Sequence, residues 1–294
     1  MSKKINGVLT AIVTTFNKHG EFSPSAMAKQ IQRQLDCGNG IFCGGTNGEF
    51  FVLNEKEKLA LMATCTDEVA GKAAVVGHIG EISTRETIRL GKQAAALGVD
   101  AVSVITPYFV PLKQEELVWH YRTIADALTI PIFLYNIPAR TGNTLQPETV
   151  RQLASHPNII GIKDSAGSHE SLSGFLNAVK DLKGFDVLNG PDSLIHQGFV
   201  EGCSACISGL ANVAPKEINA IWSRFHAGDV EGSRLAQEQV TGLRTELYQV
   251  AFSPAAVKKA VSLMGYEVGE SRYPVRFSGA DEEKIIQIIN KYTK

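Results

Sequence analysis

Residues 130–136 read Ile-Pro-Ile-Phe-Leu-Tyr-Asn, residues 147–155 read Pro-Glu-Thr-Val-Arg-Gln-Leu-Ala-Ser, and residues 159–164 read Ile-Ile-Gly-Ile-Lys-Asp. The first and third runs are short and apolar, as buried strands are. The second begins with proline and mixes apolar with polar residues, as a surface helix does. A strand, a helix and a strand in this order form a unit whose two strands lie parallel in one sheet. The stretch therefore predicts a parallel sheet covered by helices.

The same alternation runs along most of the chain. The short apolar runs are Val8–Thr14, Gly40–Gly44, Ala73–Ile79, Ala101–Thr106, Ile130–Tyr135, Ile159–Lys163, Asp186–Leu188 and Ala205–Ile207. The helix-like stretches are Ser25–Asp36, Glu55–Val69, Thr84–Leu97, Gln114–Ala127, Pro147–Ser155, Glu170–Lys180, Ser193–Glu201 and Pro215–Ala227. Eight such units in succession close on themselves, so the sequence predicts the α/β class and a (β/α)8 TIM barrel.

Three more helical patterns follow the eighth unit with no strand-like run between them, at Val230–Val250, Pro254–Leu263 and Ala280–Tyr292. We expect a catalytic barrel over residues 1–228 and a C-terminal helical appendage, packed on the barrel, over residues 229–294. A length of 294 residues suits one such barrel, and no linker-like or low-complexity stretch divides the chain.

The overall composition points to work on small molecules. The net charge is −1 and 44% of the residues are hydrophobic, so the chain lacks the basic character of proteins that bind nucleic acid or anionic membranes. No apolar run reaches the length of a membrane span and no secretory leader is evident, so we expect a cytoplasmic protein.

Five cysteines, an odd number in a long chain, indicate reduced thiols. Cys203 and Cys206 have the spacing of a redox pair, but the segment runs into a strand-like stretch and lacks a second pair of ligands, so we expect ordinary buried thiols and no metal. Trp119 and Tyr121 in the fourth helical stretch are expected to pack in the core.

The candidate chemistry lies where strands end, because active sites of these barrels form at the carboxyl ends of the strands. Lys163 ends the sixth apolar run, and Tyr135 ends the fifth. A lysine in apolar surroundings has a lowered pKa, and a neighbouring phenol can move the protons that a Schiff base requires. The alternative is that Lys163 only pairs with Asp164 and that Tyr135 is a core aromatic.

Two loops add groups that suit a carboxylate. The second run ends in Gly44-Gly45-Thr46-Asn47-Gly48-Glu49-Phe50, where a hydroxyl and consecutive amides can meet an anion. Arg140 follows the fifth run and can bind a carboxylate with two parallel hydrogen bonds. The alternatives are that the glycine-rich segment is an ordinary tight loop and that Arg140 is a solvated loop charge.

Taken together, the segments 45–49, 135–138, 140–142 and 161–164 resemble the dihydrodipicolinate synthase and N-acetylneuraminate lyase family over nearly the whole chain. The resemblance implies a class I aldolase in which Lys163 attacks the ketone of pyruvate, or of another 2-keto acid, and holds it as an iminium. It implies Tyr135 as general acid and base, Thr46 as its link to the substrate, and Thr46 and Asn47 as the carboxylate site. It implies neither a metal nor an organic cofactor.

The same comparison implies pocket positions after strands seven and eight, at Gly190 and Ile207, with Asp192 as a candidate neighbour. It also implies a homotetramer built as a dimer of dimers. In the synthases a second tyrosine of the strand-four loop reaches the neighbouring subunit's site. Phe109 stands at that position here, and Tyr108 would serve if the loop were shifted by one residue.

The resemblance leaves the substrate open. The synthase reaction joins pyruvate and aspartate semialdehyde, and Arg140 suits that aldehyde. Asn47 and Phe50 depart from the synthase pattern and resemble catabolic aldolases for 4-hydroxy-2-oxoglutarate or 2-keto-3-deoxy sugar acids. Glu55, Lys58 and Ile82 replace residues of the lysine-inhibited forms, so we expect no lysine inhibition. A non-catalytic member that only binds ligand is a further alternative, although Lys163, Tyr135 and Thr46 are all present.

Overall fold

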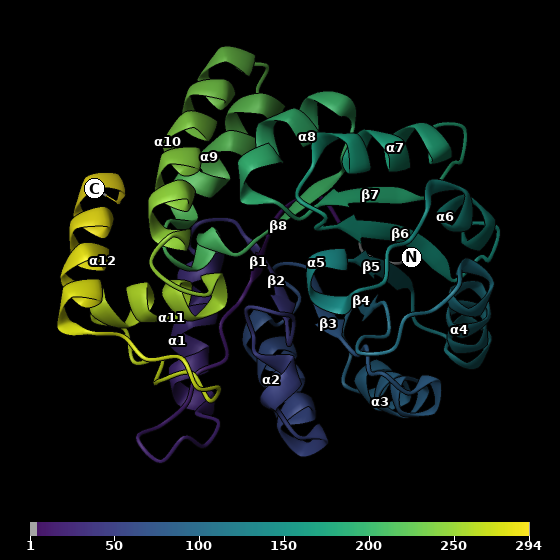
Figure 1. The fold of residues 1–294 in the computed structure, drawn as a ribbon, viewed down its shortest axis with the longest axis horizontal. Helices are drawn as coiled ribbons and strands as arrows, with labels where there is room; N and C mark the ends of the chain where they lie inside the picture. The colour runs from purple at the N-terminus through teal and green to yellow at the C-terminus, as the bar shows by residue number, and fades with distance from the viewer. Residues whose placement is uncertain (1–4, 294) are drawn as a thin grey trace.

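A computed structural model describes residues 5–293 and closes eight parallel strands into a barrel in which each strand pairs with its sequence neighbours and β1 pairs with β8 (Figure 1). The strands are β1 (Gly7–Ala11), β2 (Gly40–Cys43), β3 (Val75–His78), β4 (Ala101–Ile105), β5 (Ile132–Asn136), β6 (Ile159–Asp164), β7 (Asp186–Asn189) and β8 (Ala205–Ser208). The predicted TIM barrel is confirmed, and each predicted strand is present with its ends shifted by a few residues.

Helices connect consecutive strands and cover the outside of the barrel. They are α1 (Pro24–Leu35), α2 (Glu55–Val69), α3 (Thr84–Ala96), α4 (Gln114–Ala127), α5 (Pro138–Thr141), α6 (Pro147–Leu153), α7 (His169–Val179), α8 (Ile195–Glu201) and α9 (Pro215–His226). The C-terminal helices are α10 (Val230–Tyr248), α11 (Ser253–Leu263) and α12 (Gly279–Tyr292). The short helix α5 directly after β5 was not predicted, because four residues carry no helical period.

Helix starts follow the capping chemistry of the sequence. At α2 the Asn54 side chain accepts a hydrogen bond from the Glu57 amide at 3.0 Å, and the Glu57 carboxylate accepts one from the Asn54 amide at 3.0 Å. This reciprocal pair satisfies two amides that the helix leaves free. Ser23 holds the N-cap position of α1 without a capping side-chain bond, and Pro24 begins that helix.

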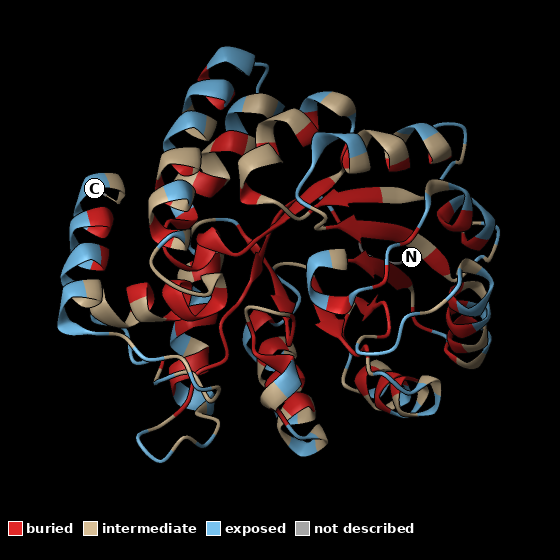
Figure 2. Ribbon diagram, in the orientation of Figure 1, coloured by how far each residue is buried: buried red, intermediate tan, exposed pale blue. Residues whose placement is uncertain are grey.

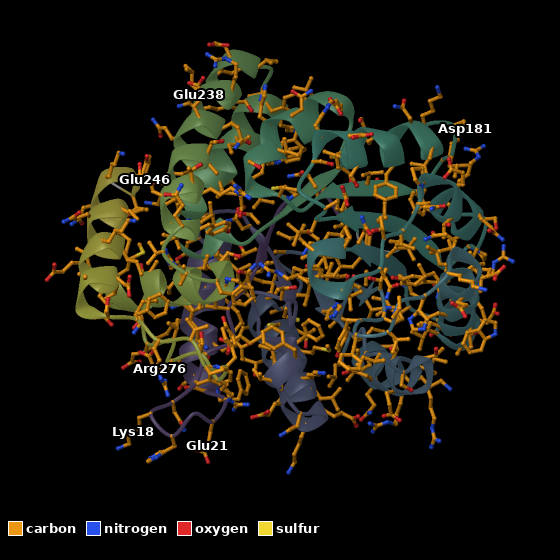
Figure 3. All side chains as sticks on the ribbon, in the orientation of Figure 1. Lys18, Glu21, Asp181, Glu238, Glu246 and Arg276 are labelled. Carbon is orange, nitrogen blue, oxygen red and sulfur yellow. The ribbon has the colours of Figure 1, made fainter. Side chains whose placement is uncertain are left out.

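The barrel has an apolar interior and an apolar outer layer beneath the helices. Figure 2 shows the strands as a mainly buried centre, with the exposed residues on the outward faces of the helices and in the connecting loops. Side chains from most of the strands form one buried cluster in the interior, including those of Leu9, Phe42, Phe133 and Leu188. Charged residues such as Lys18, Glu21, Asp181 and Glu238 lie at the periphery (Figure 3). The filled interior leaves only the strand ends for a site.

The C-terminal helices share one hydrophobic cluster with the barrel. In this cluster Val8 and Cys206 of the barrel lie with Leu243 of α10, Val257 of α11 and Ile285 of α12. The predicted domain boundary between residues 228 and 229 coincides with the turn from α9 to α10 and stays a prediction.

Candidate active site

Lys163 is buried at the carboxyl end of β6, where it lies in register with Tyr135 of β5. Its Nζ is 4.2 Å from the ring centre of Phe42 and 4.1 Å from that of Tyr135. Burial lowers the pKa of Lys163, while Tyr135 and Asp192 nearby act in the opposite direction. Within residues 5–293 it has no ion pair with Asp164, whose carboxylate instead accepts a hydrogen bond from the Asn136 amide group at 2.8 Å. The buried lysine is therefore available as a nucleophile.

The Tyr135 hydroxyl meets the Thr46 hydroxyl across the barrel mouth. The two oxygens are 3.1 Å apart, and either can donate. Tyr135 is 2% exposed and its ring packs edge-on against Phe42, with centroids 6.2 Å apart. The phenol, the threonine and the lysine are thus brought together, as the sequence predicted, and a proton can pass between the two hydroxyls.

The loop after β2 holds Thr46 and Asn47 in a tight backbone turn. A side chain at Gly48 would lie 3.1 Å from the Gly44 nitrogen and 3.2 Å from the Ile12 oxygen, so only glycine fits without a shift. The Thr14 hydroxyl donates to the Gly48 carbonyl at 2.6 Å. The loop is therefore fixed from both sides, which suits a site that positions an anion.

Glu49 ends this loop and ties it to the C-terminal helices. Its backbone has φ 58°, in the left-handed region, and its carboxylate accepts hydrogen bonds from Lys258 Nζ at 2.7 Å and from the Arg272 amide at 3.0 Å. Both side chains of the Glu49–Lys258 pair are 1% exposed. Sequence reasoning missed this pair, because no pattern links residues 209 positions apart.

A cavity of about 270 Å³ opens at Lys163. Seven of the eight predicted site residues line it, namely Thr46, Asn47, Tyr135, Arg140, Lys163, Gly190 and Ile207. A side chain at Gly190 would collide with the Ser165 hydroxyl and the Asp164 carbonyl, which explains the glycine. The resemblance thus selected residues from five different strand ends that the fold brings into one cavity.

The cavity has a wall that the sequence did not predict. Arg244 and Tyr248 of α10, and Ser253 and Pro254 at the start of α11, line it beside Asp192. These residues lie beyond the eight βα units, where the barrel rule gives no reason to look for site residues. The C-terminal helices therefore contribute to the site as well as packing on the barrel.

Arg140 stands on α5 at the cavity rim. Its guanidinium carbon is 4.5 Å from the ring centre of Phe252, which lies just before α11. The residue is exposed, so its charge can meet an incoming ligand. Stacking on an aromatic face holds the guanidinium plane in one orientation.

Tyr108 lies outside this cavity, in a neighbouring one of about 190 Å³ that shares Thr46 and Arg140 with it. Its ring packs edge-on against Phe50 at 5.9 Å, and burial raises the pKa of Tyr108. Phe109 points away, 91% exposed, with φ 76°. In this single chain, therefore, neither side chain lines the cavity of Lys163.

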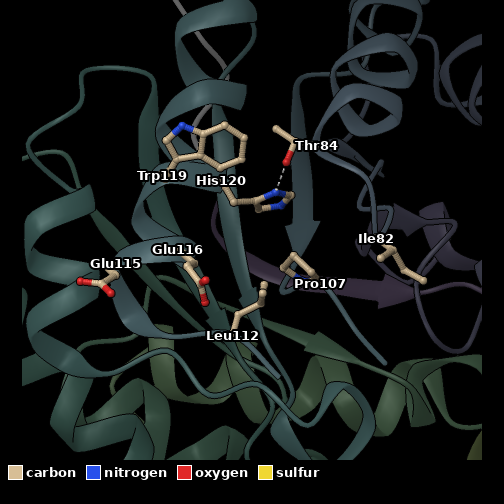
Figure 4. Close-up of a pocket in the computed structure, with 8 residues that line it drawn as sticks. All are labelled: Ile82, Thr84, Pro107, Leu112, Glu115, Glu116, Trp119 and His120. Carbon is tan, nitrogen blue, oxygen red and sulfur yellow. Dashed lines mark hydrogen bonds between the residues drawn. The ribbon is translucent and has the colours of Figure 1, made fainter. Parts of the chain in front are cut away.

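A separate cavity of about 400 Å³ lies between α3 and α4, as Figure 4 shows. His120 is buried in its lining, and one ring nitrogen lies 2.8 Å from the Thr84 hydroxyl. Trp119 is 63% exposed at this cavity, so the prediction that it packs in the core is wrong, whereas Tyr121 is buried as predicted. The sequence pattern of this helix did not distinguish an aromatic residue that faces the core from one that faces solvent.

The described residues also bear on the thiols, on metal ligands and on membrane-spanning helices. Cys203 and Cys206 are buried, and burial raises the pKa of Cys203 to about 12, which fits inert thiols. Within residues 5–293 no group of three or more metal-ligating side chains is present, and no helix there is both long and apolar enough to cross a membrane.

Comparison with known proteins gives a consistent answer. The model of the dihydrodipicolinate synthetase family matches residues 4–291. The chain belongs to this family. It is 36% identical to the 4-hydroxy-tetrahydrodipicolinate synthase of Geobacter metallireducens over 97% of the chain and 98% of that protein. It is 35% identical to a DapA-like lyase of Halobacterium salinarum over 95% of the chain and 90% of that protein.

A solved structure in this family has the same fold. The dihydrodipicolinate synthase of Thermotoga maritima superposes with a TM-score of 0.93 at 32% identity, covering 98% of both chains. The predicted family is confirmed over the length of the barrel and the C-terminal helices. Membership of the dihydrodipicolinate synthetase family makes the chain a lyase of the class I aldolase type.

Proposed function

We propose that the protein is a Schiff-base aldolase that joins, or splits, pyruvate and an aldehyde through Lys163. The observation that carries the proposal is the position of the Lys163 amine, buried beside two aromatic rings, next to the hydroxyl pair of Tyr135 and Thr46. A desolvated amine reaches its neutral, nucleophilic form at a lower pH than a solvated one.

The groups in this cavity are sufficient for each step of the proposed reaction. The Lys163 nitrogen attacks the ketone carbon of pyruvate, and Tyr135 protonates the oxygen that leaves as water, which gives the iminium. Loss of a methyl proton to the phenolate gives an enamine, whose carbon attacks the aldehyde. The new alkoxide takes its proton back from Tyr135 with Thr46 in the chain, and water then releases the product from the lysine. No oxidant, metal or organic cofactor enters these steps.

Thr46 and Asn47 are proposed to bind the pyruvate carboxylate. Their loop offers a hydroxyl, an amide side chain and backbone amides at the cavity wall. Gly190 allows close approach of the substrate from β7, and Ile207 faces it from β8. Tyr108 is proposed only as a neighbour of the site, through the cavity that shares Thr46.

Two acceptor aldehydes are candidates. Aspartate semialdehyde is the first, in a 4-hydroxy-tetrahydrodipicolinate synthase-like reaction, because Arg140 suits its carboxylate and relatives carry that name. The second is the acceptor of a catabolic 2-keto acid aldolase, favoured by Asn47 and Phe50 in the loop after β2. We further propose a cytoplasmic location, from the composition and pattern of the sequence, and a homotetramer, on the family resemblance.

Borohydride reduction in the presence of pyruvate tests the proposal. Mass spectrometry of the wild-type protein is expected to find a reduced pyruvyl group on Lys163, and Lys163→Ala is expected to lose it. The control variant is Lys92→Ala, at an exposed lysine of α3, which should still be labelled. Absence of an adduct from folded wild-type protein would leave the non-catalytic, ligand-binding alternative.

A further inference from the structure

Among the side chains that line the Lys163 cavity, the cationic ones outnumber the anionic ones. Lys163, Arg140 and Arg244 are cationic and Asp192 is the one carboxylate among the described lining residues. The iminium that Lys163 forms with a ketone also carries one positive charge. Pyruvate brings one negative charge, so a further negative charge on the second substrate would complete the balance.

Asp192 is largely engaged by the protein itself. Its carboxylate accepts hydrogen bonds from the Ser208 hydroxyl at 2.5 Å, the Tyr248 hydroxyl at 2.9 Å and the Leu210 amide at 3.3 Å. A carboxylate has about four acceptor positions, so about one remains. The side chain is also only 5% exposed. The cavity therefore has little capacity to bind an ammonium group or several hydroxyl donors.

Arg244, in contrast, has its donors free. Within residues 5–293 its guanidinium forms no hydrogen bond or ion pair, and its central carbon lies 5.3 Å from the ring centre of Tyr248. The backbone that carries it is anchored, because Gln237 of the same helix donates to the Asp192 carbonyl at 2.9 Å. An anchored, half-buried guanidinium with unused donors in a substrate cavity suits a bidentate carboxylate contact.

We propose that the acceptor is an aldehyde acid without an amino group, and that Arg244 on α10 determines this specificity by binding the carboxylate of the acceptor. The inference rests on the proposed function and names the substrate class of the same cavity. An acceptor with an ammonium, such as aspartate semialdehyde, would bring a fourth cation to a cavity whose one carboxylate already holds three hydrogen bonds. A neutral aldehyde would leave the hydrogen-bond donors of Arg244 unused, although its charge still acts on Asp192.

The test is steady-state condensation by the full-length protein with saturating pyruvate and four aldehydes: glyoxylate, succinic semialdehyde, aspartate semialdehyde and butanal. We expect kcat/KM for succinic semialdehyde or glyoxylate to exceed that for aspartate semialdehyde and for butanal by about tenfold or more, as loss of a charge-assisted hydrogen bond predicts. Equal or higher kcat/KM for aspartate semialdehyde would overturn the inference.

Variants separate Arg244 from the rest of the site. Arg244→Gln is expected to lower kcat/KM for the acid aldehydes by about tenfold to a hundredfold, mainly through KM, and to leave butanal within about twofold. Arg244→Lys should restore part of the loss, and Arg85→Gln, at an exposed arginine of α3, should behave as wild type. A rise in the pyruvate KM of Arg244→Gln instead, or an unchanged acid-to-neutral ratio, would contradict the assignment. Whichever result Arg244→Gln gives, borohydride should still trap pyruvate on the protein. Loss of this trapping would mean that the proposed function itself is wrong.

Discussion

Lys258 of α11 and Glu49 of the loop after β2 form an ion pair of 2.7 Å in which both side chains are 1% exposed. The Lys258 ammonium also lies 3.9 Å from the ring centre of Phe16. Burial lowers the pKa of Lys258 to about 8 although Glu49 acts in the opposite direction, so the lysine is still mostly charged at pH 7. The pair joins the loop that carries Thr46 and Asn47 to the C-terminal helices.

Removal of one partner should therefore destabilise the protein strongly. Lys258→Met leaves the Glu49 carboxylate buried with the Arg272 amide as its remaining partner, and breaking a buried pair costs about 3–5 kcal/mol of unfolding free energy. Urea unfolding measures this loss of unfolding free energy. The double variant Glu49→Gln, Lys258→Met should regain much of the loss. Lys291→Met, which breaks an exposed pair with Glu246, should leave the urea midpoint close to that of the wild type.

The same pair should also affect substrate binding. In a Lys258→Met protein that remains folded, displacement of Glu49 loosens the adjoining Thr46 and Asn47, so we expect the pyruvate KM to rise while borohydride trapping at saturating pyruvate persists. A pyruvate KM equal to that of wild type would show that the pair contributes to stability alone.

Lys163 gives a prediction about pH. Its pKa is lowered by burial, so between the folded-state pKa and the higher unfolded-state pKa the unfolded chain binds more protons, and stability increases with pH across that window. At any pH below the unfolded-state pKa, burial of the lysine destabilises the fold, so Lys163→Met should be more stable than wild type at pH 7. Thermal unfolding at several pH values measures both effects. Equal stability of the two proteins at pH 7 would contradict the argument.

The pH dependence of imine formation should be set by the protonation of Lys163. The rate of pyruvate trapping should increase as pH rises through the lowered pKa of Lys163, at a pH below the ordinary lysine value, because the neutral amine is the nucleophile. Single-turnover trapping across a pH series measures the midpoint. A midpoint at or above the value of a solvated lysine would mean that the amine is not desolvated in solution.

The hydroxyl pair of Tyr135 and Thr46 should act in proton transfer and contribute little to binding. Tyr135→Phe keeps the ring against Phe42 and removes the acid, so kcat should fall by about a hundredfold to ten-thousandfold with a small change in pyruvate KM. Thr46→Val should lower kcat less, because Tyr135 remains. A Tyr135→Phe enzyme with wild-type kcat would assign the proton transfers to another group.

The sequence predicted the barrel and its central residues because both follow local rules. Each strand is a short apolar run, and Lys163 and Tyr135 lie where such runs end. The contribution of α10 could not be predicted in this way. Arg244 lies on a surface-like helical pattern, and only the packing of that helix against the barrel, through residues such as Leu243, brings it to the cavity. The Glu49–Lys258 pair likewise depends on tertiary contact alone.

Assembly provides the last prediction. Phe109, in the loop after β4, and Trp119 of α4, which lines the cavity of Figure 4, are large apolar side chains with 91% and 63% exposure. Large exposed apolar side chains of this kind occur at protein–protein interfaces. We expect a tetramer in sedimentation velocity, weakened by Phe109→Asp and unaffected by Val230→Asp, which changes an exposed valine in the first turn of α10. A stable, fully active monomer would contradict the expected assembly and would mean that Phe109 is not needed by a neighbouring site.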